Sequence, residues 1–183
     1  MWKSLSSCAG LLVAALISSS PLSAETNEEL PTVKIGFLDL TEDIRYDDWG
    51  IHPVDIRSAT TIINRRAYAG AQLAIKELEQ FTRIAKAYFS LERHSLSTAE
   101  EMAKTILKMR DSGSYFFLID APTSVVSEVA QLTRDEDIYL FNTTAIGDSL
   151  RNEACQKHLF HMTASRAMRT DALSQYLVER KWK

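Results

Sequence analysis

The sequence predicts an α/β fold, a parallel sheet with helices on both faces. Three observations lead to this prediction. Strand-like and helix-like segments alternate along the chain, which is typical of parallel strands joined by helical crossovers. The strand-like segments are mainly apolar and do not alternate with polar residues, as expected for strands buried on both faces. The segments between them repeat apolar residues at the three- and four-residue spacing of an amphipathic helix.

The first strand is the clearest, because Val33–Leu38 is rich in β-branched and aromatic residues and ends at Asp39. Later apolar runs of similar length are predicted to be strands for the same reason. A brief extended stretch follows at 159–162. The four predicted strands are 33–38, 84–91, 115–119 and 138–141.

Capping signals support the helices. Ser97 or Thr98 can cap one helix, with Glu100 or Glu101 completing a capping box, and Gly113 can end it. Pro122 suits the first position of the next helix. Small residues at 67, 70, 71 and 74 are expected to let an earlier helix sit close on the sheet. The predicted helices are 59–79, 98–112, 122–132 and 166–179.

The N-terminus has the three parts of a secretory signal. Lys3 gives a basic start, residues 9–17 form a short apolar core, and small residues lead up to Ala24. The core is too short to cross a membrane as a helix. We therefore expect cleavage after Ala24 and export of the rest of the chain. The predicted divisions are a signal peptide at 1–24, a flexible lead at 25–32, an α/β lobe at 33–142, a crossing at 143–163 and a final helical segment at 164–183.

Charge and composition exclude several function classes. Lys and Arg total 21 against 24 for Asp and Glu, a net charge of -3, which argues against a nucleic-acid partner bound by bulk charge. The segment from Asp39 to Glu42 is acidic where a dinucleotide-binding fold needs a glycine-rich loop. No metal-ligand spacing is evident, so no cofactor is expected. Cys155 is the one cysteine outside the signal, and it is either buried or has its partner outside this chain.

Candidate ligand contacts lie at the carboxyl ends of the predicted strands, where open α/β sheets bind ligands. In the long loop 41–58, Arg45 and Tyr46 could hold a flat anionic ligand, or the loop could pack on its own domain. Acidic residues of this loop, including Asp43, lack the ligand order of a calcium loop and are expected to be solvated.

Two further turns share this placement. Residues 120–124 offer hydroxyls and N–H groups at a helix start, suited either to a ligand carboxylate or to simple capping, and 142–144 has the same ambiguity. The candidate ligand-binding residues are Asp39, Arg45, Tyr46, Asp120, Pro122, Thr123, Ser124, Asn142, Thr143 and Thr144, with none expected to be catalytic.

Two stretches carry a family resemblance. Val33–Phe37 with Gly70–Ile75 resembles the first strand and helix of type I periplasmic binding proteins, which include the leucine/isoleucine/valine-binding proteins of ABC transporters. Residues 142–173 are similar to a substrate-binding subgroup associated with pyrroloquinoline quinone (PQQ)-dependent alcohol dehydrogenase systems; the matching residues are Asn142–Ala145, Leu150–Asn152, Cys155, Phe160–His161, Ser165–Met168 and Asp171–Leu173.

The resemblance implies two Rossmann-like lobes that clamp a ligand between them and dock on an inner-membrane ABC permease. It also implies a longer chain, so that the second lobe is largely missing and 164–183 is its first helix. The family's ligand contacts would fall at 39–46, 120–124 and 142–144. Residues 120–124 replace a longer Ser-rich turn, which disfavours a plain amino acid as ligand.

We therefore expect a periplasmic solute-binding component of an ABC system, linked to PQQ-dependent alcohol oxidation. Its small polar or anionic ligand would be PQQ or an alcohol-oxidation metabolite, and Arg45, Thr123 and Thr143 would contact it. The alternatives are the ligand-sensing domain of a signalling receptor, a branched-chain amino-acid binding protein, and an enzyme that uses the same cleft.

Overall fold

The computed structural model describes residues 30–46 and 67–182. The predicted signal peptide, most of the predicted flexible lead and the first part of the predicted helix 59–79 lie outside these ranges. So does most of the long loop after the first strand. Within the described ranges, no helix is long and apolar enough to cross a membrane.

Five parallel strands form one sheet in the order β2-β1-β3-β4-β5. This confirms the predicted α/β class, and residues inside the predicted crossing supply the fifth strand. The order reverses direction between β1 and β3, which makes that junction the switch point of the sheet. The strands are β1 Thr32–Leu40, β2 Tyr88–Leu96, β3 Phe116–Asp120, β4 Tyr139–Asn142 and β5 Leu159–His161.

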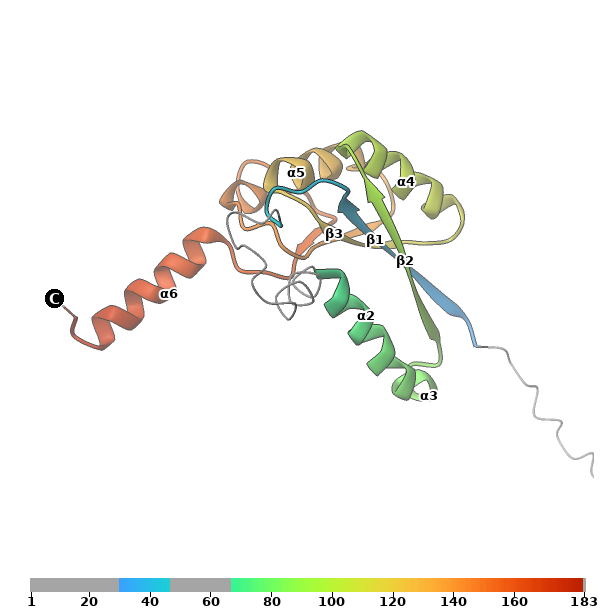
Figure 1. Ribbon diagram of the computed structural model, residues 1–183, viewed down its shortest axis with the longest axis horizontal. Coiled ribbons are helices and arrows are strands. Elements are labelled where there is room, and N and C mark those ends of the chain that lie inside the picture. The colour runs from blue at the N-terminus through green and yellow to red at the C-terminus, as the bar shows by residue number, and fades with distance from the viewer. Residues whose placement is uncertain (1–29, 47–66, 183) are drawn as a thin grey trace, which may run out of the picture.

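Helices lie on both faces of the sheet (Figure 1). Two of them, α4 and α5, cover one face, while α2 and α3 lie on the other. The last helix, α6, projects away from the body. The helices are α2 Ala67–Leu78, α3 Thr82–Ala85, α4 Ala99–Asp111, α5 Thr123–Leu132 and α6 Arg166–Glu179, with short 3-10 turns η1 Glu79–Phe81 and η2 Asp148–Arg151.

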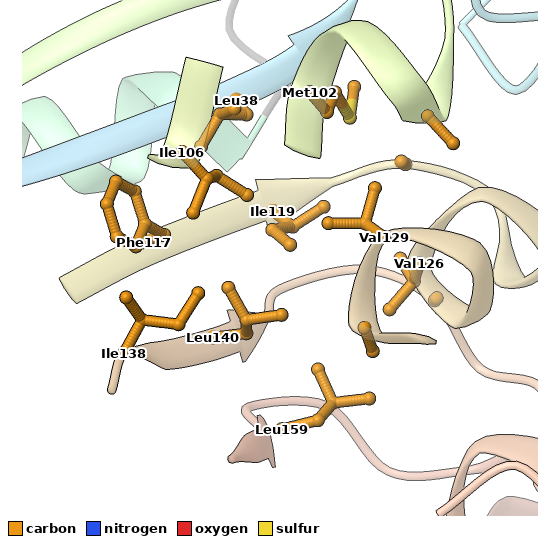
Figure 2. Packing of buried hydrophobic residues seen from close by; sticks show 14 of the residues in the cluster. Leu38, Met102, Ile106, Phe117, Ile119, Val126, Val129, Ile138, Leu140 and Leu159 are labelled. Carbon is orange, nitrogen blue, oxygen red and sulfur yellow. The ribbon is translucent and has the colours of Figure 1, made fainter. Parts of the chain in front are cut away.

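The hydrophobic core lies between the sheet and the helices α4 and α5 (Figure 2). Complete burial of a large aliphatic or aromatic side chain is worth about 1.5–3 kcal/mol. This layer therefore fixes the strands whose ends carry the candidate site. Side chains that are wholly buried here are Leu38, Met102, Ile106, Phe117, Ile119, Val126, Val129 and Leu140.

The second strand begins later than predicted. The first half of the predicted strand 84–91 is wrong, because residues 82–85 form helix α3 and Lys86 then takes a left-handed conformation with φ 51°. Ile84 at the start of the predicted run is 80% exposed. A short apolar run does not distinguish a strand from the end of a helix, and β2 instead continues through charged residues to Leu96.

The helix α2 does not pack as expected. Its small residues were predicted to bring it close to the sheet, but no residue of α2 is buried, and a Cβ added at Gly70 would meet nothing within 4 Å. Contact runs through Tyr68, whose ring meets Phe37 edge-on at 5.1 Å between centroids. A large aromatic ring therefore sets the distance between α2 and the sheet.

The capping predictions are resolved at α4. The Thr98 hydroxyl accepts the Glu101 N–H at 3.2 Å, and the Glu101 carboxylate accepts the Ser97 N–H at 2.9 Å. The first bond is the N-cap half of a capping box, and the Glu101 carboxylate reaches one residue beyond the N-cap. Gly113 follows the helix with φ 88°. Pro122 is the N-cap of α5 rather than its first helical residue.

Candidate functional site

The carboxyl ends of β1 and β3 meet at the switch point of the sheet. Asp39 and Asp120 are in register there, each at or next to the last residue of its strand, and both are buried. The partners of the two carboxylates come from different segments. Asp39 is paired with residues of β2, whereas Asp120 is paired with the loops that follow β1 and β4.

Asp120 is the centre of the larger cluster. Its carboxylate is fully buried and accepts hydrogen bonds from the Arg45 guanidinium at 2.9 Å, the Tyr46 hydroxyl at 2.9 Å and the Thr144 hydroxyl at 2.7 Å. These four residues come from three segments that are far apart in the sequence. All four were predicted ligand contacts, and the structure brings them together.

Arg45 is shared between two carboxylates. Its Nη2 lies 2.5 Å from Asp43 and 2.9 Å from Asp120, and its Nη1 donates to the Thr144 hydroxyl at 2.8 Å. Burial lowers the pKa of Arg45, but the hydrogen bond and charge of Asp43 and the charge of Asp120 outweigh it and raise that pKa above its ordinary value. The expectation that Asp43 is solvated is wrong, because it is 3% exposed.

Tyr46 acts as a neutral donor to Asp120. Its hydroxyl lies 2.9 Å from each oxygen of the Asp120 carboxylate. Burial, together with the charge of Asp120, raises the pKa of Tyr46 to about 12. The phenol therefore keeps its proton at physiological pH, and the Arg45 guanidinium lies over its ring at 5.3 Å.

Asp39 belongs to a second cluster that sequence reasoning only partly found. Its carboxylate accepts from Arg93 at 2.5 Å and from the Ser95 hydroxyl at 2.7 Å. Arg93 also lies over the Tyr68 ring at 4.6 Å, so it joins β1, β2 and α2. The signal was available, because residues 93–97 follow the predicted second strand at the same edge of the sheet, but Arg93 and Ser95 were not named as candidate contacts.

Asn142 shapes the turn after β4. Its side-chain oxygen accepts the N–H groups of Thr144 at 3.2 Å and Ala145 at 2.8 Å, and its amide donates to the Ala145 carbonyl at 2.7 Å. The neighbouring Thr143 hydroxyl donates to the Ile119 carbonyl at 2.8 Å. These bonds hold Thr144 against Asp120.

The predicted residues Pro122, Thr123 and Ser124 line a different feature. They edge an open groove of about 830 Å³ along α5 and η2, whose lining does not include the cluster around Asp120. The Thr123 hydroxyl accepts the Gly147 N–H at 3.2 Å, which ties the loop after β4 to α5. The structure thus places these three predicted residues apart from the two carboxylate clusters around Asp120 and Asp39.

Other candidate chemistry receives little support in the part of the chain that the structure describes. No group of three His, Cys, Asp or Glu residues there is placed to hold a metal ion. Cys155 is exposed, so the buried-thiol alternative is wrong. Around the switch point, three buried aspartates face two guanidinium groups, and hydroxyls fill the space between them.

Comparisons with known proteins show the fold. No protein-family model and no curated protein matches the chain. A periplasmic binding protein from Burkholderia mallei matches with a TM-score of 0.53 and 16% identity, covering 83% of this chain and 37% of its own. A branched-chain amino acid transporter substrate-binding protein from Streptococcus pneumoniae, solved with isoleucine, matches with a TM-score of 0.56 and 20% identity, covering 81% of this chain and 38% of its own.

The chain therefore spans well under half the length of these solved proteins. At such identities the likeness establishes architecture and nothing finer. The five-stranded parallel sheet and its helices have the fold of part of a periplasmic binding protein.

Proposed function

We propose that this chain is a solute-binding module that holds a small polar ligand at the carboxyl ends of β1, β3 and β4. One observation carries the proposal. Arg45, Tyr46 and Thr144, from separate segments, converge on the buried Asp120 beside the switch point, where open α/β sheets bind ligands. The match to solved binding proteins supports it.

The charges favour an uncharged polar ligand. Arg45 already faces two carboxylates, so an incoming anion would meet an excess of negative charge. A ligand hydroxyl could instead donate a hydrogen bond to the Tyr46 oxygen, whose own proton is directed at Asp120. Between the two ligands expected from the sequence, this favours an uncharged alcohol-oxidation metabolite over PQQ, which carries three carboxyl groups.

The setting we propose is the periplasm, with delivery to an inner-membrane ABC permease. The signal-like pattern ending at Ala24 and the resemblance over 142–173 support export and a link to PQQ-dependent alcohol oxidation. Hinge closure around the ligand would make the closed form the one that the permease recognises.

Native mass spectrometry of the protein purified from its source tests this function. We expect a bound small molecule without net charge. A thermal-shift panel then compares a short-chain alcohol, its aldehyde, its carboxylate, PQQ and isoleucine. A shift with PQQ or the carboxylate alone would overturn the charge argument, and no shift together with an empty protein would overturn solute binding.

Variants locate the site once a ligand is known. We expect Thr144→Val to weaken binding at least about tenfold, because it removes a hydroxyl that bridges Arg45 and Asp120. Tyr46→Phe keeps its ring and is the second test. Thr170→Val on the exposed face of α6 is the matched control. If calorimetry shows the same ligand affinity in Thr144→Val and Tyr46→Phe as in the unchanged protein, the ligand does not bind at the cluster around Asp120.

A further inference from the structure

Asn142, the last residue of β4, joins the cluster around Asp120 to the neighbouring strand β5. It pairs in register with His161, and its side-chain Nδ2 lies 3.1 Å from Nδ1 of the imidazole. Its side-chain oxygen accepts the N–H groups of Thr144 and Ala145 in the turn after β4. The Thr144 hydroxyl then donates to Asp120 at 2.7 Å. Hydrogen bonds thus link the imidazole to the buried carboxylate by way of the turn.

The contacts of Asn142 leave its amide no alternative orientation. The side-chain oxygen receives two backbone N–H groups, which can only donate, so the nitrogen must be the atom that faces the imidazole. That nitrogen also donates to the Ala145 carbonyl at 2.7 Å. Asn142 is completely buried, and all the donors and lone pairs of its amide are engaged. The amide therefore cannot rotate without breaking the bonds that shape the turn.

The imidazole of His161 accepts the bond from Asn142, so its Nδ1 carries no proton. The ring is consequently neutral, with its one N–H at Nε2. A proton added at Nδ1 would set one N–H against another across 3.1 Å. The two side chains stay opposite each other, because β4 and β5 pair in register and the Met162 N–H donates to the Asn142 carbonyl at 2.9 Å.

The surroundings of His161 oppose that proton. Burial lowers the pKa of the imidazole and the charge of Arg151 in η2 lowers it further, although a backbone hydrogen bond with Leu150 acts the other way. The titratable residue of β4 is Tyr139, at the opposite end of that strand. The carboxylate of Asp148 in η2 is engaged by the start of α6. Among the described residues, the charge that acts on the ring is thus positive.

We propose that His161 is a positioning residue for the cluster around Asp120, which it holds through Asn142 only while its imidazole is neutral. A proton at Nδ1 ends the bond to Asn142, the amide turns, and Thr144 loses the backbone bond that keeps its hydroxyl on Asp120. The cluster is intact near neutral pH and loosens in mild acid. Only the use of the cluster as a ligand site rests on the proposed function, because the coupling of His161 to Thr144 needs no ligand.

Heteronuclear NMR of the full chain without ligand tests this coupling. The His161 ring and the amides of Thr144 and Ala145 are followed from about pH 7.5 to 5.0. We expect the amide signals to move with the same midpoint as the ring, below the ordinary histidine pKa of about 6.5. Their protection against hydrogen exchange should fall at least about tenfold. Amides that stay unchanged while His161 titrates would overturn the proposal.

Two substitutions of His161 separate the hydrogen bond from the bulk of the ring. In His161→Asn, an amide oxygen takes the place of Nδ1 as acceptor and does not titrate, so the signals of Thr144 and Ala145 should keep their neutral-pH positions throughout. His161→Leu has no acceptor, and the same amides should show the loss of protection already at about pH 7.5. Equal behaviour of the two variants would overturn the positioning role, whatever the pKa of the ring.

His158→Gln is the matched control. The pKa of His158 is also lowered by burial, but its ring contacts the Thr133 hydroxyl at 3.2 Å and not the turn after β4. The titration of the Thr144 and Ala145 amides should persist in this variant, and its disappearance would overturn the assignment to His161. A protein that shows the expected titration but binds no solute would contradict the proposed function alone.

Discussion

At the scale of single residues, Arg45 is the key cation of the site. Its guanidinium forms ion pairs with two buried carboxylates, those of Asp43 and Asp120. The loop after β1 reaches the ends of β3 and β4 through it. Removing the cation would leave two carboxylates buried beside each other without a counter-charge, and such uncompensated burial is costly.

Arg45→Met is accordingly expected to lower the free energy of unfolding by about 3 kcal/mol. Arg134→Met, which breaks an exposed pair with Asp135, should cost less than about 0.5 kcal/mol. Urea denaturation of both variants measures the difference. Equal losses would mean that the Arg45 network contributes no more than a surface ion pair.

His158 introduces a pH dependence. It is 4% exposed, and its Nε2 lies 3.2 Å from the Thr133 hydroxyl. That hydroxyl donates to the Val129 carbonyl, so Nε2 must be the protonated nitrogen, and Nδ1 is buried with no hydrogen-bond partner among the described residues. Burial, aided by the charge of Lys157, lowers the pKa of His158.

Stability should therefore fall as the pH drops below about 6.5, because there the unfolded chain takes up a proton that the folded chain refuses. The loss approaches at most about 1.4 kcal/mol per pH unit for one histidine. His158→Gln should flatten urea midpoints measured between pH 7.5 and 5.5. Part of the pH dependence should remain in this variant, because burial also lowers the pKa of His161. An unchanged slope in H158Q would assign the effect to other groups.

At the scale of elements, the turn after β4 and the start of α5 fit closely. A Cβ added at Gly147 would lie 2.2 Å from Cγ2 and 2.6 Å from Oγ1 of Thr123. Crowding by Thr123, and not backbone conformation, requires glycine at this position, because any residue can adopt its φ of -64°. At Gly70 in α2, the same addition meets open space.

The two glycines should respond in opposite directions. Gly147→Ala is expected to cost about 1–3 kcal/mol of stability, since the turn or α5 must shift. Gly70→Ala should raise stability by about 0.5–1 kcal/mol, because alanine restricts the unfolded chain and favours the helix. Thermal melts give both values, and adding Thr123→Ala should recover part of the G147A loss. A neutral G147A would mean that the turn has slack.

Element prediction from the sequence worked where the pattern was long or chemically marked. The capping signals at Thr98 and Glu101 located α4, and apolar runs located β1, β3 and β4. It failed between α2 and β2 for two reasons. Ile84 is apolar but lies exposed on a helix, and β2 is an edge strand that contains charged residues. Local pattern does not report which strand becomes an edge.

For the whole molecule, the sequence predicted the class of fold. It also predicted that the polar site residues lie at the carboxyl ends of the strands. It did not predict the pairing within the site. Arg45 and Asp120 are distant in sequence, and only the register of β1 with β3 brings their segments together. Asp43 and Arg93 were missed as partners for the same reason, since charge balance depends on three-dimensional neighbours.

The place of β1 between β2 and β3 also constrains the order in which the molecule can assemble during synthesis. It leaves the ribosome first among the strands, yet its neighbours β2 and β3 are made only after α2 and α4 respectively. Phe37 and Leu38 therefore stay uncovered until much of the chain has emerged. Folding of this sheet is thus governed by non-local contacts, which makes it slow and leaves the nascent chain dependent on protection from aggregation.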